Sequence, residues 1–464
     1  MSRIGAHLNG VEQYLLNALA RANNAAAANA KRIATGKKIN SPSDDPAAWL
    51  TISKTEDRLS LVQAASARVS VASTIAAQTQ KTLDQVKTQL DTIRTTLLTD
   101  ETWSLSTSDR SSAQLKIDAA LAEINTLAGT QINGRRLLDG SADFTYSGNN
   151  TAQIQDLQVY STNGRTISGS VTATATQASR TYTGAGGKTT AAATFDLTGQ
   201  RGSVAVTVSN GETLTNLAAS INQYSHRTGI TAAVAGNKVT LTTIDYGTAA
   251  TLDVTVTSGS FTTVGTTAGT DATATINGRA YTGIGNRFEV NDNGLHFAVG
   301  FQAGFTGAFS TVTVNSARAL RFALTTDVSQ ITTLGLPGVQ IANFRDVSGT
   351  LDQLTTGGTL SGLNGNTSQA IRTVDEALSK LGIMQANVDG FANASVASSA
   401  ALMSSFETTL TDSLARLNTV NDDEESLLLS KNQTLATNAS AALAILQQQQ
   451  NGLLAILQNI AGIR

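Results

Sequence analysis

The C-terminal stretch of the chain, from about Asn438 to Ile460, restricts the possible folds more than any other. Apolar residues recur there at steps of three and four, the spacing of a coiled-coil seam. Only Gln450 interrupts this series, which consists of Leu443, Leu446, Leu453, Leu457 and Ile460. No charged residue lies between Lys431 and Arg464. An apolar, uncharged helix at a chain end needs a partner, because terminal segments fray unless something holds them.

The other end of the chain offers that partner. The same alternation of four and three residues runs through Ile4, Leu8, Val11, Leu15, Ala18, Ala22 and Ala25. Both ends therefore predict halves of one coiled coil. The expected fold class is α+β, with a long α-helical coiled-coil core formed by both termini and β-rich outer domains inserted in the middle.

Composition excludes several classes of protein. Charged residues make up 14% of the chain and the net charge is −2, so no charge surplus indicates a nucleic-acid partner. Cysteine is absent, which excludes disulfides, thiolate metal sites and cysteine nucleophiles. The N-terminus shows no secretory signal, and no run of about 18 apolar residues predicts a membrane span. We expect a chain that is cytoplasmic or is exported without a cleaved signal.

The first 140 residues are predicted to be mostly helical. One helix is expected from Ser2 to about Thr35, where Gly36 ends it. The stretch Lys37-Lys38-Ile39-Asn40-Ser41-Pro42-Ser43-Asp44-Asp45-Pro46 is expected to form a fixed, non-helical spoke between helices. Asp45 followed by Pro46 is a strong helix start, and helices are expected from Pro46 to about Leu98 and from Arg110 to about Gly129.

Two motifs in this part resemble bacterial flagellins. The first is Ala34-Thr35-Gly36-Lys37-Lys38-Ile39-Asn40-Ser41-Pro42-Ser43-Asp44-Asp45-Pro46-Ala47. The second is Gln131-Ile132-Asn133-Gly134-Arg135-Arg136-Leu137-Leu138-Asp139-Gly140. The resemblance covers about residues 1–140 and 365–464. It implies an inner tube built from paired terminal helices, a second helical shell around it, and an insertion that faces outward.

The middle of the chain changes to strand patterns. Alternating runs at 204–208, 239–244 and 253–256 predict strands, and a short helix capped by Thr213 is expected at 213–224. The strand–strand–helix–strand–strand order of about 195–257 resembles the small IN module inserted in flagellins and filament-cap proteins. Residues 172–194 are rich in Thr, Ala and Gly and are expected to form an exposed connection. Helix returns near Thr367, and a polar break at 421–425 precedes the terminal helix.

These patterns divide the chain into five segments. The expected domains are 1–40 and 430–464 (inner coiled coil), 41–145 and 365–429 (helical core), and 146–364 (β-rich insertion).

No residue pattern predicts catalysis, a cofactor or a metal. The three histidines, His7, His226 and His296, lack neighbouring ligands at metal spacing. The H-E-x-x-H signature of a metalloprotease, a G-x-S-x-G elbow and a Walker A loop are all missing. The acidic run 422–425 better fits a helix N-terminus than a calcium site. Lys37 and Lys38 are better explained as a solvated loop or a subunit contact.

Self-assembly remains as the predicted function: a structural subunit of the helical flagellar filament, secreted and extracellular, that gives motility. Apolar seams at both ends need partners, and identical chains joined by a contact that does not close into a ring form a helical filament. The candidate assembly residues are Leu8, Val11, Leu15, Ser41, Pro42, Asp44, Asp45, Pro46, Leu443, Leu446, Leu453, Leu457 and Ile460. The alternative from the residues alone is a monomer with an intramolecular coiled coil.

The resemblance also implies partners. They are the flagellar export apparatus, a secretion chaperone on the C-terminal helix, and the junction and cap proteins. An innate immune receptor reads some flagellins through a motif that corresponds here to residues 91–97. Arg94 matches, whereas the motif's acidic residue and second arginine do not, so weak or no activation is expected. Rival assignments are the hook–filament junction protein and an adhesin displayed through the β-rich insertion.

Overall fold

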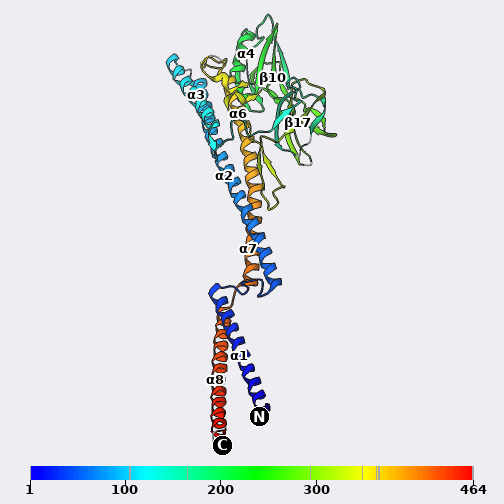
Figure 1. The fold of residues 1–464 in the computed structure, drawn as a ribbon. Coiled ribbons are helices and arrows are strands. Elements are labelled where there is room, and N and C mark those ends of the chain that lie inside the picture. Colours follow the sequence, from blue (N-terminus) through cyan, green and yellow to red (C-terminus); the bar gives the residue numbers. More distant parts are fainter. Residues whose placement is uncertain are drawn as a thin grey trace. The chain divides into compact units, whose positions relative to one another are not determined.

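The computed structural model describes residues 2–103, 106–162, 164, 166–292, 294–346, 348–361, 363 and 366–461. The chain forms two compact units (Figure 1). Unit 1 comprises residues 1–67 and 400–464, and unit 2 comprises residues 68–399. The expected α+β architecture is confirmed, because helices from both ends of the chain flank a β-rich middle.

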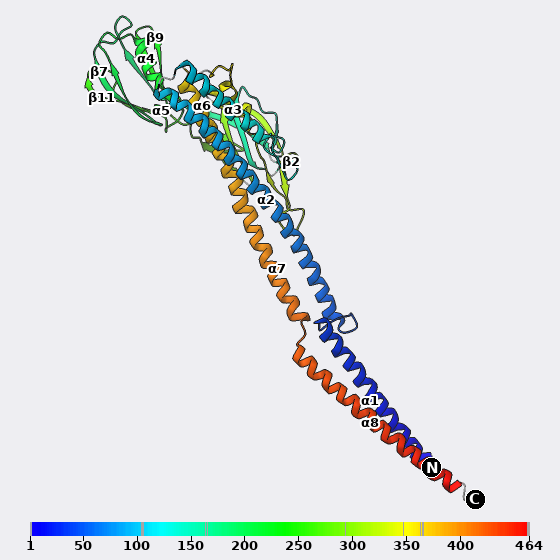
Figure 2. The ribbon, with the colours of Figure 1, turned by 90° about the vertical axis from the view of Figure 1, so that its left-hand side faces the viewer.

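Unit 1 is helical. It contains α1 (Ser2–Thr35), α8 (Asp422–Ala461), the first part of α2 (Pro46–Trp103) and most of α7 (Ala397–Asn418). The chain ends α1 and α8 lie side by side in both views (Figures 1 and 2). They run antiparallel, since the end of α1 meets the start of α8 through Arg32 and Glu425, and Glu12 near the start of α1 meets Gln450. A second pair of segments meets at a small cluster of Val62, Ala65 and Met403.

The helical core of unit 2 is formed by the rest of α2, α3 (Thr107–Ala128) and α6 (Thr367–Gly390). Fully buried aliphatic residues on α2 follow the helical period; they are Leu83, Val86, Leu90, Ile93 and Leu97. The strand pairs and short helices that complete this core are β1 (Gln131–Ile132), β2 (Arg135–Arg136), β18 (Leu320–Phe322), β19 (Thr332–Leu334), β20 (Arg345–Asp346), β21 (Gly349–Thr350), η1 (Ile341–Asn343) and η2 (Leu351–Leu354). Buried apolar residues from Leu320 to Leu363, within the expected insertion, therefore pack with the helical core.

A wide helical turn links α6 to α7. Residues Phe391–Val396 (η3) form a π-helical segment, an arrangement that locally adds one residue to the turn.

Two sheets of unit 2 enclose a separate aromatic core. One sheet has the strand order β14-β13-β5-β17-β3 and the other β15-β16-β4. Phe288, Phe297 and Phe301 are fully buried between them. The strands are β3 (Thr145–Ser147), β4 (Ile154–Ser161), β5 (Thr166–Ala173), β13 (Thr273–Ile276), β14 (Arg279–Thr282), β15 (Arg287–Asp292), β16 (Leu295–Phe301) and β17 (Gly307–Asn315).

A further core belongs to residues 178–268, which we call the α4 module. Its sheets have the orders β6-β10-β9 and β12-β11-β7-β8. The elements are β6 (Ser179–Thr183), β7 (Ala193–Gly199), β8 (Gly202–Val208), α4 (Leu214–Gln223), α5 (Ser225–Thr228), β9 (Ile230–Ala235), β10 (Lys238–Thr243), β11 (Thr251–Gly259) and β12 (Gly265–Ala268). The expected strand–strand–helix–strand–strand order is present, with α5 and one further strand, β9, added after α4. The predicted cap of α4 is confirmed, because the Thr213 hydroxyl accepts a hydrogen bond from the Asn216 amide.

The expectation of an exposed connection at 172–194 is wrong. Residues 179–183 form β6, which pairs with β10. Tyr182 in this strand is 2% exposed and stacks on Phe261, which also stacks on Phe195. Tyr182 is the only large apolar residue in this strand, and its neighbours are small or polar. The alternation that would predict a strand is therefore hard to recognise in the sequence.

Candidate assembly surface

The pair formed by α1 and α8 buries some of the seam residues predicted from sequence. Leu443 and Leu446 of α8 are 7% and 8% exposed, and Ala22 of α1 is 6% exposed. Leu15 is half-buried. A single partner helix covers these residues because they lie on one stripe at steps of three and four.

Polar residues also occupy this seam, close to the end of α1. The amide of Asn29 donates a hydrogen bond to the Glu425 carboxylate, and the Arg32 guanidinium lies 3.1 Å from the other carboxylate oxygen. Asn432 donates to the Asn29 side-chain oxygen at 3.0 Å. Asn29 and Glu425 are 5% and 8% exposed. Their mutual bonds satisfy groups that would otherwise be buried without partners.

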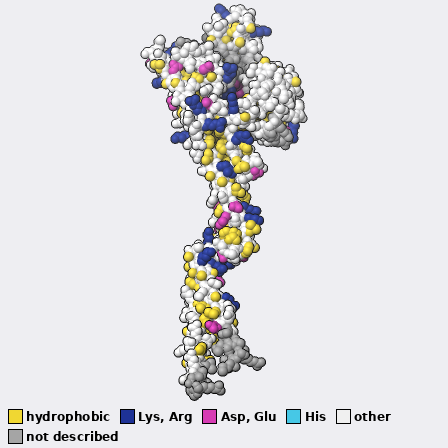
Figure 3. All heavy atoms as spheres, in the orientation of Figure 1, with side chains coloured by type: hydrophobic (Ala, Val, Ile, Leu, Met, Phe, Trp, Pro, Cys, Tyr) yellow, Lys and Arg dark blue, Asp and Glu magenta, His cyan; other side chains and the backbone are white. Residues whose placement is uncertain are grey.

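Many large apolar side chains of the same two helices remain uncovered. Val11 is 49% exposed and Leu453 is 44% exposed. Others above 40% exposure on α1 and α8 are Tyr14, Leu16, Leu427, Leu435, Ile445, Leu454 and Ile456. Hydrophobic side chains gather along the helices on the face seen in Figure 3, whereas the sandwich near β17 presents mostly uncharged polar atoms. An apolar surface of this extent on a helix pair is typical of an interaction site.

The spoke between α1 and α2 is held by two aspartates. The Asp44 carboxylate accepts hydrogen bonds from the amides of Asn40 and Ser41, both at 2.8 Å. These bonds hold the pKa of Asp44 below its ordinary value, the Asn40 bond most strongly. The Asp45 carboxylate accepts from the amides of Ala47 and Ala48 and so caps α2.

The spoke also pairs with the end of α7 and with the residue that follows it. The Lys38 amide donates to the Asn418 carbonyl at 2.7 Å, and the Ile39 amide donates to the Asn418 side chain at 2.7 Å. Lys37 forms a bridge with Thr419. An open hollow of about 430 Å³ lies beside these contacts, and Trp49 is among its lining residues.

The predicted assembly residues thus fall into three groups. Leu443 and Leu446 are buried in the helix pair with half-buried Leu15, whereas Val11 and Leu453 are exposed. The predicted residues in the spoke are exposed apart from half-buried Ser41; they are Pro42, Asp44, Asp45 and Pro46. The side chains of Leu8, Leu457 and Ile460 lie outside the described residues.

Sequence reasoning missed the polar seam residues and Asn418. Asn29 and Arg32 follow Ala25 at steps of four and three, and Glu425 and Asn432 precede Leu443 on the same period. A polar residue at a seam position was therefore the available signal. Asn418 gave none, because its role depends on the pairing of two loops that are distant in sequence.

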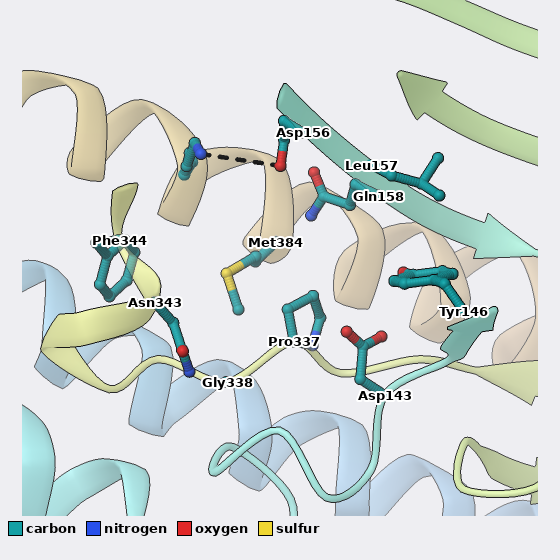
Figure 4. Close-up of a pocket in the computed structure, with 11 residues that line it drawn as sticks. Asp143, Tyr146, Asp156, Leu157, Gln158, Pro337, Gly338, Asn343, Phe344 and Met384 are labelled. Carbon is teal, nitrogen blue, oxygen red and sulfur yellow. Dashed lines mark ion pairs between the residues drawn. The ribbon is translucent and has the colours of Figure 1, made fainter. Parts of the chain in front are cut away.

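A small hollow of about 100 Å³ lies in unit 2 between β4, α6 and the chain around Pro337 (Figure 4). On one side Lys380 of α6 lies 3.9 Å from Asp156, and Arg287 binds the same carboxylate at 2.7 Å. Asp143 is also in the lining, beside Tyr146 (Figure 4). No set of three acidic or histidine side chains that could hold a metal occurs among the described residues.

Burial dominates the electrostatics of Asp143. Its carboxylate accepts a hydrogen bond from the Phe144 amide at 2.7 Å. Desolvation nevertheless raises the pKa of Asp143 to about 6, since a charged carboxylate is poorly solvated there. The same desolvation, with the charge of Asp143, raises the pKa of Tyr146.

One described helix is long and apolar enough to cross a membrane. It lies within Pro46–Thr99 of α2, where an 18-residue window has a mean hydropathy of 1.2. This is weak evidence, because core helices of soluble proteins share these properties. Of that window, 33% is buried inside the protein.

Comparison with known proteins identifies the N-terminal part of the chain. A search of curated proteins found no match. The flagellar cap protein FliD from Escherichia coli (domains D1-D2-D3) is 17% identical, with a TM-score of 0.29; the alignment covers 44% of this chain and 66% of that one, just under two thirds of its length. FlgL from Xanthomonas campestris is 14% identical, with a TM-score of 0.28 and coverage of 78% and 99%. The family model of the bacterial flagellin N-terminal helical region matches residues 8–143. Over these residues the chain is similar to the bacterial flagellin N-terminal helical region.

Proposed function

We propose that this chain is a flagellin, the subunit that polymerises into the extracellular flagellar filament. The observation that carries the proposal is the uncovered apolar surface on the paired terminal helices. Leu453, Leu454 and Ile456 are 44%, 55% and 58% exposed on a stretch without charged residues. Identical helices of neighbouring copies would cover this surface at a gain of about 25 cal/mol per Å².

Unit 2 differs from the terminal helices, and this difference supports the same assignment. Its three clusters bury their own apolar residues, so it does not need a neighbour to complete its cores. We infer that α1 and α8 form the inner part of the polymer and that the α4 module and the sandwich face outward. The export apparatus, a chaperone on α8, and the junction and cap proteins are the partners that this function requires.

Electron microscopy of the full chain beside a version lacking residues 430–464 tests the proposal. Long tubes of constant width from the full chain, lost on truncation, are expected. Short caps, or no polymer without a hook end to grow on, would favour the hook–filament junction protein instead. A stable monomer under all conditions would contradict polymerisation and indicate a coiled coil closed within one chain.

The exposure of Leu453 allows a sharper test. Leu453→Glu puts a charge where the single chain already exposes 44% of the side chain, so unfolding of the free chain should change little. In a polymer the charge would be buried, at a cost on the order of several kcal/mol per interface. Loss of tubes is therefore expected. The matched control is Ile284→Glu, at a side chain of unit 2 that is 81% exposed; normal tubes from Leu453→Glu would refute the assignment.

A further inference from the structure

We propose that the polar cluster of Asn29, Arg32, Glu425 and Asn432 fixes the register in which α1 and α8 pair. We further propose that it favours pairing within one chain over pairing with the same helices of another copy. The second statement rests on the proposed polymer, whereas the first concerns the single chain alone.

The seam around the cluster does not specify one register by itself. Ala22 and Ala439 are buried, and Ala18, Ala25 and Ala436 are half-buried on the same stripe. Small identical side chains at steps of three and four pack almost equally well after a slip of seven residues. An apolar seam therefore leaves several pairings close in free energy.

The polar cluster removes this degeneracy. In the observed register, Glu425 receives the Asn29 amide and the Arg32 guanidinium, and Asn432 binds the Asn29 oxygen. A slip of seven residues in one direction sets Glu425 against Ala25, with no donor among the seam residues there. A slip in the other direction sets Asn29 against Ala436. Either slip separates buried polar groups from their partners, which costs about 1–3 kcal/mol for each group.

The position of the cluster favours the helices of one chain. It lies next to the spoke, where Lys38 and Ile39 bind Asn418. These contacts hold the end of α1 beside the start of α8, so the two halves of the cluster meet at a high effective concentration. A helix of another copy would have to supply the same polar partners without this tether.

The absence of cysteine makes engineered disulfides a clean measure of register. Arg32 faces Glu425, and three seam steps from each lead to Ala22 and Ala436. Ala22→Cys/Ala436→Cys therefore reports the observed register. Ala22→Cys/Leu429→Cys and Ala22→Cys/Leu443→Cys report slips of one heptad in the two directions. Gels run under denaturing, non-reducing conditions separate intrachain loops from linked dimers.

In the otherwise unsubstituted full chain, we expect the first pair to close within the chain at least about ten times more than either slipped pair. Adding Asn29→Leu/Glu425→Leu replaces the buried polar groups by apolar ones of similar size. Thermal stability should then stay equal or rise, while slipped pairs and linked dimers reach comparable yields. A purely structural role would instead lower stability and leave the register unchanged.

Two further variants complete the test. Glu425→Gln keeps an acceptor for Asn29 and should retain the observed register. Leu446→Ala removes apolar burial from the same pair and should lower stability without slipping. The proposal is overturned if Asn29→Leu/Glu425→Leu keeps the tenfold preference, or if the unsubstituted chain shows none. Because the intrachain disulfides form without polymer, a failure of filament growth would not be mistaken for a failure of the register proposal.

Discussion

The two units of this chain differ in how completely they bury their apolar side chains. In unit 2, residues such as Phe195, Phe297 and Leu90 are completely buried in cores closed by their own sheets and helices. In unit 1, the helix pair covers one narrow stripe and leaves residues such as Leu454 and Ile456 more than half exposed. A closed core makes a fold independent, whereas an open one depends on what binds to it. The contrast indicates that the ends of the chain serve assembly and that the middle folds for itself.

Removing a large side chain from a closed core gives the largest expected change in stability. Phe195→Ala should lower the free energy of unfolding of the α4 module by about 3–5 kcal/mol, because it leaves a cavity in the buried core of the module, where Phe261 stacks on the lost ring. Chemical denaturation followed by circular dichroism would measure it. Val11→Ala, at a 49% exposed side chain of unit 1, is the control and should change little in the free chain. Equal effects at the two positions would break the comparison.

The sequence predicted where the helices lie better than it predicted which segments pack into each hydrophobic core. Regular steps of three and four placed α1, and the Asp45-Pro46 pair placed the start of α2 correctly. The strand around Tyr182 was missed, because one buried aromatic among threonines and glycines gives little periodic signal. The packing of residues 320–363 on the helical core was also not foreseen, since short irregular segments carry no period at all. Within the site, polar seam residues such as Asn29 were not predicted, because the apolar period of the seam does not mark them.

The pKa values of two aspartates, one in each unit, shift in opposite directions, and they predict a change in stability of intermediate size. Asp44 of the spoke is exposed and its pKa is lowered by amide hydrogen bonds, whereas burial raises the pKa of Asp143 in unit 2 to about 6. Below about pH 3 Asp143 is mostly protonated in both the folded and unfolded states. As the pH rises to about 6, only the unfolded state ionises freely, so the folded state loses stability and keeps that penalty at higher pH.

Asp143→Asn should therefore stabilise unit 2 by about 2–3 kcal/mol at pH 7.5 and by almost nothing below about pH 3. The amide retains an oxygen acceptor for the Phe144 amide. Denaturant unfolding at the two pH values measures the difference. The matched control is Asp139→Asn, since hydrogen bonding by Ser141 lowers the pKa of Asp139; its effect at neutral pH should have the opposite sign. A gain from Asp143→Asn that is independent of pH would contradict the burial of a charge.

Removing a helix cap gives the smallest expected change in stability. It also tests whether the loss of a local hydrogen bond affects the cooperative unfolding of the whole unit. Thr213→Ala removes the hydroxyl that binds the Asn216 amide at the start of α4, and about 1 kcal/mol should be lost. Because Leu214 and Leu217 of α4 are buried in the module's core, the loss should appear in its cooperative unfolding, and Thr213→Ser should restore it.

Asp45→Ala removes the equivalent cap from α2 at an exposed position. There the amides of Ala47 and Ala48 should exchange hydrogen faster while the unfolding of unit 2 stays unchanged, since an uncovered helix start can fray without opening a core. If Asp45→Ala instead lowered the unfolding midpoint of the α4 module, the two units would be one cooperative body and the contrast between them would fail.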